Sequence, residues 1–446
     1  MAELTRIARH GGTVLAGQLA VIAFGVTDTL VAGRYADTAL AALSVGSAVY
    51  ISVYVGLIGV LQATLPTWAE LRGAGATTQL GRSVRQSLYL CLLAVLAGMA
   101  VLLGPGPLLR GTEVPPALHD DVYRYLGVLA VALLPALLFR LYASLNQALG
   151  RPLLVTWLQI GGLACKIPLS IWFAFGGAGL PAQGVVGCAL ATLVVHCGMV
   201  LVALWMLRTR PIYQPYALWR WPEAPDWRQI GAFARIGIPG GLAIVVEVTS
   251  FTLMALFIAR LGAVASAGHQ IAASLASVLY MVPLSVGIAT SARVSYWIGA
   301  GDPVQVRSAI QAGFVLVACT AITFSAILFI ASDAIAGLYT RTPDVAQMAA
   351  TLLRWVALYH LADAVQALCV FVLRCYRVTV APLAIYCVLL WGLGLAGGYL
   401  LVYHGVGSLP AMADPAAFWM ASSVALVLTA VAFVLLLRYT VAARSA

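Results

Sequence analysis

The feature of this sequence that most constrains its fold is a series of apolar segments, each about 20 residues long, that recurs along the whole chain. A helix of this length crosses a hydrocarbon layer about 30 Å thick. Of the 446 residues, 62% are hydrophobic and only 9% are charged, whereas a water-soluble domain carries about 25% charged residues. Because lipid cannot satisfy backbone N–H and C=O groups, each segment should be an α-helix. The predicted segments are residues 13–34, 45–68, 86–107, 122–148, 154–175, 184–207, 236–260, 270–292, 310–332, 347–372, 381–403 and 415–438.

The basic residues lie mainly between the apolar segments or at segment ends. The formal net charge is +10, and because Lys166 is the one lysine, 24 of the 25 basic residues are Arg. With the N-terminus placed in the cytoplasm, seventeen Arg residues fall on the cytoplasmic side and six, including Arg110, on the outer side. This bias follows the positive-inside rule and predicts that both termini are cytoplasmic. The basic charge therefore reflects membrane topology, and we do not expect nucleic-acid binding.

The two halves of the chain share one pattern. Shifting the first half by 226 residues places Gly-Ala-Gly, Thr, Tyr and Arg residues on identical counterparts. The pairs are Gly73–Gly75 with Gly299–Gly301, Thr64 with Thr290, Tyr54 with Tyr280, and Arg151 with Arg377. Six segments per copy is an even number, so both copies have the same orientation, as in parallel repeats related by a pseudo-two-fold axis along the membrane normal. We predict an all-α integral membrane protein of two six-helix lobes, residues 1–207 and 236–446, with a cytoplasmic linker at 208–235.

Three acidic residues lie within the predicted apolar segments: Asp28, Glu247 and Asp363. A charge at the centre of a transmembrane helix costs about 2.5–3.5 kcal/mol, so such residues indicate a functional site by default. A proton, a metal ion, a cationic substrate or a paired Arg has to offset that cost. Under the shift of 226 residues Asp28 has no acidic counterpart, because Met254 takes its place. The two lobes are therefore chemically unequal.

Oxygen-bearing and aromatic side chains accompany the two acids of the second half. Phe251 follows Glu247 by four residues, and Tyr359 precedes Asp363 by four, so each pair shares a helix face. Hard cations such as Na⁺ prefer oxygen ligands, and aromatic ring faces attract cations. We predict that Glu247 and Asp363 form one site for a cation or a proton. Further candidates near it are Tyr280, Gln366 and His360, which lies one turn before the second acid.

A simpler alternative is that basic residues of the same chain neutralise the acids. Arg140 and Lys166 lie in predicted segments of the first half, where they can neutralise Asp28 but not the two acids of the second half. We also expect that Lys166 extends its ammonium group towards a membrane surface. For Asp28, structural pairing and a functional role both stay open.

Other functional classes fit the sequence less well. A membrane-embedded enzyme needs a nucleophile or a metal cluster, and the sequence has no HExxH motif, no GxSxG motif and no large soluble loop, so we expect no enzymatic activity. The eight Cys residues include no CxxC pair and are interpreted as packing residues. A flippase for a lipid-linked precursor would need several basic residues around a diphosphate, whereas the deep charges here are mainly acidic. The flippase is kept as the alternative to a cation transporter.

Three sequence blocks resemble the MATE (multidrug and toxic compound extrusion) family and its NorM-like members. The first segment, GQLAVIAFGVTDTLVAGRY, is similar to the opening helix of those proteins, with Asp28 in the place of their acid. The second half reads GIPGGLAIVVEVTSFTLMALFIARLGAVASAGHQIAASLASVLYMVPLSVGIATSARVSYWIGAG, with Gly-x-Pro, Glu, His-Gln-Ile and Gly-Ala-Gly in the family's order. The third block, LYHLADAVQALCVFVLRCY, resembles an Asp-Ala-x-Gln segment followed by Leu-Arg. Cys375 and Val378 depart from the family, which usually has Gly and Asp in that loop.

This resemblance implies a secondary transporter that exports organic cations in antiport with Na⁺ or H⁺ by alternating access. It implies an ion site at Glu247 and Asp363, with Tyr280 and Phe251 beside it, and this site would hold Na⁺ if the protein is sodium-coupled. The candidates for contact with substrate or proton are Asp28, Gln270, Tyr359 and His360.

The expected partners and location follow from the same resemblance. We expect cationic lipophilic drugs or dyes as substrates, the lipid bilayer as surroundings, and no cofactor other than the coupling ion. We expect a monomer in the bacterial cytoplasmic (inner) membrane.

Overall fold

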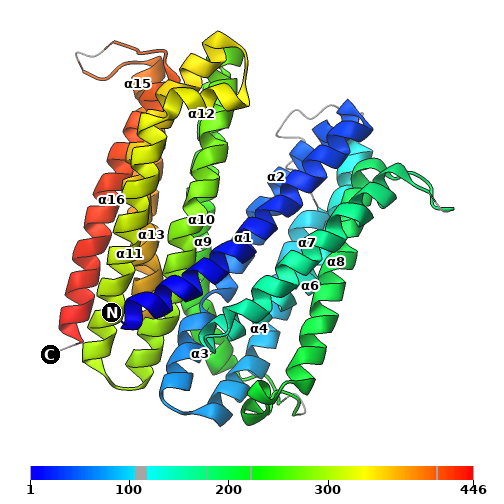
Figure 1. Cartoon of the computed structure of the whole chain (residues 1–446), viewed down its shortest axis with the longest axis vertical. Helices are drawn as coiled ribbons and strands as arrows, with labels where there is room; N and C mark the ends of the chain where they lie inside the picture. The colour runs from blue at the N-terminus through cyan, green and yellow to red at the C-terminus, as the bar shows by residue number, and fades with distance from the viewer. Residues whose placement is uncertain are drawn as a thin grey trace. The chain divides into compact units, whose positions relative to one another are not determined.

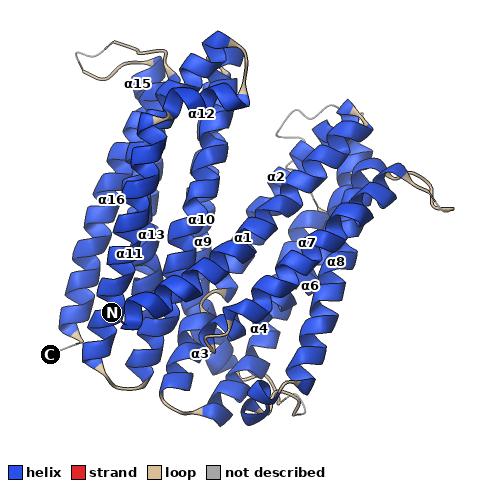
Figure 2. Ribbon diagram, in the orientation of Figure 1, coloured by secondary structure: helices blue, strands red, loops and turns tan. Residues whose placement is uncertain are grey.

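The computed structural model describes residues 2–104, 106, 118–177, 179–220, 223–407 and 410–444 (Figure 1). These residues are almost entirely helical (Figure 2), and their one isolated bridge between extended residues joins Gly177 to Leu180. Within the described ranges, twelve spans are helical, long and apolar enough to cross a membrane. They are α1 (Ala2–Tyr35), α2 with α3 (Asp37–Leu61, Thr64–Gly73), α4 (Thr77–Leu103), α6 (His119–Ala148), α7 (Pro152–Phe175), α8 (Gly184–Thr209), α9 (Trp227–Ala259), α10 (Ala263–Gly299), α11 (Pro303–Ile330), α13 (Pro343–Cys375), α14 with η3 and α15 (Val380–Tyr386, Cys387–Ala396, Gly397–Tyr403) and α16 (Pro415–Ala443). Shorter elements are η2 (Pro211–Tyr216) and α12 (Ser332–Tyr339).

The twelve predicted segments are confirmed as membrane-spanning helices, and the helices are longer than the apolar segments. α1 begins at Ala2 rather than at residue 13, and α9 begins at Trp227 rather than at residue 236. Polar contacts extend these two helices, and apolar content alone does not reveal such contacts. Arg110 of the predicted outer side and residues 221–222 of the predicted linker lie outside the described residues.

The helix bounds repeat at the offset of 226 residues. α10 begins and ends 226 residues after the start of α2 and the end of α3, and α11 begins 226 residues after α4. Gly75 and Gly301 follow α3 and α10 and both have a φ of 70°, a conformation that favours glycine because it has no Cβ. The Gly-Ala-Gly motif therefore makes the same turn twice. The two copies differ inside the helix, since α2 and α3 are separated at residues 62–63 whereas α10 continues through Pro283.

The chain separates into two compact units. The N-terminal unit comprises residues 16–241, and the C-terminal unit comprises residues 1–15 and 242–446. α1 and α9 are continuous helices, and each runs from one unit into the other. Within the C-terminal unit, Arg293 of α10 donates to both carboxylate oxygens of Glu3, at 2.9 and 2.6 Å, and so anchors the start of α1. Within the N-terminal unit, Gly237 of α9 packs so closely on the carbonyl oxygen of Val60 that a Cβ would clash.

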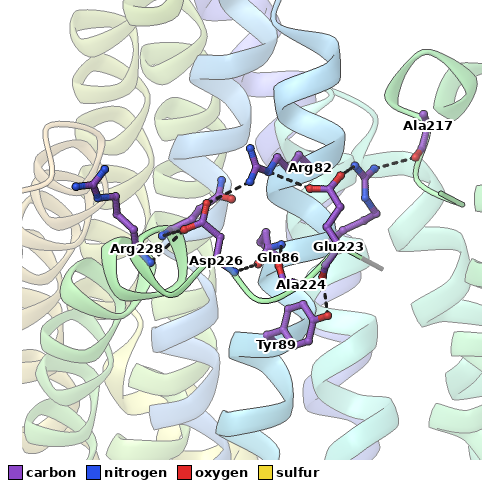
Figure 3. A network of polar contacts seen from close by, with 10 residues as sticks. Arg82, Gln86, Tyr89, Ala217, Glu223, Ala224, Asp226 and Arg228 are labelled. Carbon is purple, nitrogen blue, oxygen red and sulfur yellow. Dashed lines mark hydrogen bonds and ion pairs between the residues drawn. The ribbon is translucent and has the colours of Figure 1, made fainter. Parts of the chain in front are cut away.

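The linker before α9 is tied to α4 by charged and polar contacts (Figure 3). The Glu223 carboxylate accepts a hydrogen bond from Arg85 at 2.6 Å and pairs with Arg82 at 3.0 Å, while Tyr89 donates to the Glu223 backbone carbonyl at 2.8 Å. The hydrogen bond from Arg85, aided by the charge of Arg82, lowers the pKa of Glu223. Asp226 then accepts hydrogen bonds from the first backbone N–H groups of α9 at 3.1 and 3.2 Å, an N-cap that starts the helix.

The predicted lobe boundary at residues 208–235 stays a prediction.

Candidate functional site

The two acids predicted to share a site come together in the C-terminal unit. Glu247 lies on α9, and Asp363, only 4% exposed, lies on α13. Their carboxylates are within electrostatic range of each other. The Gln366 side chain joins them, because its Nε2 donates to Asp363 Oδ1 at 2.9 Å and it also hydrogen-bonds Glu247. Tyr386, at the end of α14, donates to Gln366 Oε1 and so fixes the orientation of the amide.

The carboxylate pair has no basic partner among the described residues. Every ion pair in that part of the chain involves other acids. The groups that interact electrostatically with the pair are the phenols of Tyr280 on α10, Tyr359 on α13 and Tyr386. The described residues contain no cluster of three or more His, Cys, Asp or Glu suited to a metal ion. A cation at this position would therefore be held by two carboxylates together with phenolic or amide oxygens.

An aromatic cluster borders the site. Phe251 packs against Tyr359 and Trp419, with ring centroids 5.7 and 6.0 Å away, and Tyr359 and Trp419 are 5.6 Å apart. Trp419 of α16 is fully buried and donates to Nδ1 of His269 at 3.3 Å. Tyr359 connects the cluster to the acids, since it also interacts with Asp363. The sequence does not reveal the role of Trp419, because a Trp within an apolar helix is equally typical of packing.

An irregular helix contacts α9 at the residue before Glu247. Cys387–Ala396 form a π-helix (η3) between α14 and α15, and π-helical turns occur often at functional sites. Trp391 of this segment donates to the backbone carbonyl of Val246 at 3.0 Å, directly before Glu247. The contact fixes η3 to α9 at the site. The one sequence hint is the Gly-rich run from Gly392 to Gly398.

The third predicted acid, Asp28, lies in the N-terminal unit and has a basic partner. Lys166 of α7 forms an ion pair with Asp28 Oδ1 at 2.7 Å, and Ser170 donates to the same oxygen at 3.4 Å. The Lys166 ammonium also donates to the carbonyl of Cys188 and to the hydroxyl of Thr192, so its three N–H groups are all used. Lys166 is 0% exposed. The expectation that it extends towards a membrane surface is wrong, because the partly buried Asp28 carboxylate and two oxygens of α8 hold it inside.

Two further predicted residues, Gln270 and His360, make no direct contact with the two carboxylates among the described interactions. Gln270 is exposed near the start of α10 and lies ten residues before Tyr280, about 15 Å along a helix. His360 is 2% exposed and lies on α13 one turn before Asp363. Its Nε2 is buried and finds no hydrogen-bond partner among the described residues. Roles for Gln270 and His360 stay predictions.

The chain is similar to known proteins over nearly its whole length. The MatE family model matches residues 14–172 and 239–400. A probable multidrug resistance protein NorM from Aromatoleum aromaticum is 36% identical over 97% of this chain and 93% of the relative. The multidrug resistance protein MdtK from Yersinia pseudotuberculosis is 33% identical, with 96% and 93% covered.

Solved structures show the same fold. The structure of the eukaryotic MATE transporter AtDTX14 superimposes with a TM-score of 0.87 at 19% identity, covering 99% of this chain and 97% of that one. The Vibrio cholerae MATE transporter VcmN in its bent form gives 0.87 at 16% identity, with 99% and 98% covered. The matched family model spans both repeats, including the helices that carry Asp28, Glu247 and Asp363. This chain, a multi-pass membrane protein of twelve helices in its described ranges, belongs to the MatE family.

Proposed function

We propose that this protein exports organic cations across the bacterial cytoplasmic membrane in antiport with Na⁺ or H⁺, by alternating access. The observation that carries the proposal is the carboxylate pair of the partly buried Glu247 and the buried Asp363, which has no basic partner in the described part of the chain. The names of the relatives, a probable multidrug resistance protein NorM and a multidrug resistance protein MdtK, support the same conclusion.

Electrostatics supplies the coupling in this proposal. Each uncompensated charge inside a membrane costs about 2.5–3.5 kcal/mol, so the carboxylate pair favours any cation that reaches it. A coupling ion and a cationic cargo that both depend on this negative charge disfavour each other's binding, and the effect is reciprocal. An inward-moving Na⁺ or H⁺ gains about 2.3 kcal/mol per 100 mV of membrane potential. That free energy drives release of the cargo on the outer side.

The Gln366 amide gives either coupling ion a means of binding. In the structure its nitrogen faces Asp363 and its oxygen accepts from Tyr386, an arrangement that suits an ionised carboxylate. A protonated Asp363 would be a donor and would favour rotation of the amide, so that its oxygen faces the acid. A Na⁺ ion would favour the same rotation, because it binds oxygen and not an amide N–H group.

The experiment that tests the proposal is dye transport in everted membrane vesicles with an imposed Na⁺ or pH gradient. We expect gradient-driven uptake of a cationic dye by the parent and background uptake by Glu247→Gln and by Asp363→Asn. Asp333→Asn is the control, because Asp333 is exposed and pairs with Arg354 at the surface. Uptake by both site variants at the parent's rate overturns the assignment. The response to each gradient identifies the coupling ion.

The flippase alternative fits the basic residues of the described chain less well. A lipid diphosphate requires several basic contacts. Among the described residues, the basic side chains within the predicted apolar segments and away from the segment ends are Arg140, Lys166 and Arg354, of which Lys166 is paired with Asp28 and Arg354 with Asp333. A single available guanidinium is too little for that substrate. We further propose that both termini lie in the cytoplasm, as the distribution of Arg predicts, and that the protein is a monomer.

A further inference from the structure

The N-terminal unit contains a cavity that the proposed function does not use. The cavity lies where the first turns of α6 and α8 meet the start of α2, and it has a volume of about 780 Å³. α6 and α8 pack side by side (Figure 1), and the residues that line the cavity all belong to this unit. In the topology predicted from the Arg residues, α6 and α8 begin on the outer side of the membrane. The cavity therefore starts at the outer surface.

The deeper part of the cavity is apolar. Its walls are formed by one face each of α6 and α8, namely by Val128, Val131, Val186, Leu190 and Leu193. Val131 is 52% exposed, so the cavity is open along α6. From Asp121 at the mouth to Val131 the helix advances ten residues, about 15 Å, which is half of a hydrocarbon layer about 30 Å thick. An open apolar wall of this depth matches the acyl chain of one lipid leaflet.

The mouth of the cavity carries charges of both signs. Asp121 and Arg124 of α6 line it. Arg124 pairs with Asp120 at 3.0 Å, but these two side chains are 68% and 74% exposed, and such a surface pair contributes little stability. The Asp121 carboxylate has no hydrogen bond or ion pair among the described residues. A guanidinium and a carboxylate three residues apart are therefore both accessible to a ligand.

Neutral polar groups complete the mouth. Tyr35 at the end of α1, Thr38 of α2 and Gln183 directly before α8 also line the cavity. Within the described ranges, their side chains make no hydrogen bond. They supply two hydroxyl groups and an amide, which can each donate and accept hydrogen bonds. The cavity thus changes from charged and polar at its mouth to apolar at depth, as a phospholipid does from its headgroup to its acyl chains.

The two charges at the mouth distinguish between headgroups. A guanidinium binds phosphate through charge-assisted hydrogen bonds, and every phospholipid carries the phosphate. A carboxylate accepts hydrogen bonds from a primary ammonium group, whereas a trimethylammonium group has no N–H to donate. A glycerol headgroup brings no positive charge at all. Asp121 therefore favours a headgroup that combines the phosphate with a primary ammonium.

The second repeat lacks this pair of charges. The offset of 226 residues places Gln347 and Ala350 of α13 where α6 has Asp121 and Arg124. The shared helical scaffold therefore does not require an acid and a base at these positions, and the charges are specific to the N-terminal unit.

We propose that this cavity binds one phospholipid of the outer leaflet whose headgroup joins a phosphate to a primary ammonium, as in phosphatidylethanolamine. Arg124 binds the phosphate, Asp121 accepts hydrogen bonds from the ammonium group, and one acyl chain lies against Val131 and Leu190. This inference goes beyond the proposed function, because the lipid is a bound ligand and not a cargo.

Three lipids that differ only in the headgroup provide the test. Binding of the first lipid to the purified full chain is measured by native mass spectrometry for phosphatidylethanolamine, phosphatidylcholine and phosphatidylglycerol with identical acyl chains. We expect the parent to bind phosphatidylethanolamine about tenfold more tightly than the other two, the scale of one charge-assisted hydrogen bond. Asp121→Asn should lose this preference and keep the affinity for phosphatidylcholine. Arg124→Gln should weaken all three lipids, because each carries the phosphate.

A variant of the apolar part tests the place of the acyl chain. Gly127 of α6 lines the cavity, and a Cβ at this position would meet no atom within 4 Å. Gly127→Leu therefore fills the cavity without a clash and should weaken the binding of all three lipids. An affinity for phosphatidylethanolamine that is unchanged in Gly127→Leu overturns the proposal.

A control in the other unit makes the result decisive. Arg354→Gln removes an exposed Arg that pairs with Asp333 at 2.9 Å, and it should leave all three affinities unchanged. A parent that binds the three lipids equally, or a preference that survives in Asp121→Asn, contradicts the proposal. If Asp121→Asn is not recovered folded, Gly127→Leu decides. The assay uses no ion gradient, so lipid binding and the proposed function can each fail without the other.

Discussion

The two repeats use the same helices but hold opposite charges inside the membrane. In the C-terminal unit, Glu247 and Asp363 share Gln366 and have no basic partner in the described residues. In the N-terminal unit, Lys166 neutralises Asp28, and the uncompensated charge is the cation of Arg140. A duplicated scaffold has therefore kept its helix bounds while its polar side chains diverged. Function in such a fold is carried by the site residues rather than by the repeat.

The largest effect that sharpens this comparison is expected from Lys166→Met. The substitution leaves the largely enclosed Asp28, 13% exposed, without a counter-charge, and breaking a buried pair by removing one partner costs up to about 3–5 kcal/mol. We expect a marked fall in the apparent Tm of the purified protein, measured by intrinsic fluorescence. Adding Asp28→Asn to Lys166→Met should restore much of the loss. An unchanged Tm in the single variant would show that the pair has no structural role.

Neutralising an acid of the C-terminal unit should change the apparent Tm in the opposite direction. Glu247 has a like-charged neighbour and no basic partner, so Glu247→Gln removes a cost of up to roughly 2.5 kcal/mol. We expect an equal or higher apparent Tm together with loss of gradient-driven export. A fall in Tm as large as that of Lys166→Met would break the contrast between the two units.

A smaller effect is expected from the aromatic wall. Phe251→Leu keeps apolar volume but removes a ring face near the carboxylates, and a cation–π contact at a partly exposed ring such as Phe251 contributes about 1 kcal/mol. We expect about fivefold weaker binding of a cationic dye, measured by anisotropy. The matched control is Phe24→Leu in the N-terminal unit, where Phe24 packs edge-on to His196 at 6.1 Å. Equal losses in both variants would indicate a general packing effect.

The smallest effect concerns the linker that precedes α9. The hydrogen bond from Arg85 lowers the pKa of Glu223, so this carboxylate contributes stability above its unfolded pKa and loses it as pH falls through the lower, folded pKa. The apparent Tm of Glu223→Gln should lie slightly below that of the parent at neutral pH. The difference should shrink as the pH falls below about 4, the ordinary range of Glu. A difference that is independent of pH would assign the effect to packing.

Most of the fold was predictable from the sequence, because lipid imposes a simple rule on each span. Segments of about 20 apolar residues fix the number and type of the helices. The rule does not fix where a helix begins when polar contacts extend it. α1 begins at Ala2, eleven residues before the predicted segment, because Arg293 binds the carboxylate of Glu3, and these two residues are 290 positions apart. Nothing local in the sequence indicates that pairing.

The candidate site was predictable where a charged residue lies within an apolar segment. Glu247 and Asp363 stand out because charge is costly in hydrocarbon. Trp419 did not stand out, because an aromatic residue in an apolar helix suits both packing and a site wall. For Lys166, the sequence left two environments open, a membrane surface and a buried pair, and only the packing of α7 against Asp28 of α1 and Cys188 of α8 decides between them.

The measurement that tests the central claim most directly is competition between a cationic dye and the coupling ion on the purified protein. Dye affinity is determined by anisotropy over a range of Na⁺ concentrations and of pH, for the parent and for the double variant Glu247→Gln with Asp363→Asn. We predict that the parent's affinity falls as Na⁺ or H⁺ rises and that the double variant binds dye weakly and without that dependence. A parent whose dye affinity ignores both ions, or a double variant that keeps the parent's full dependence, would contradict the account.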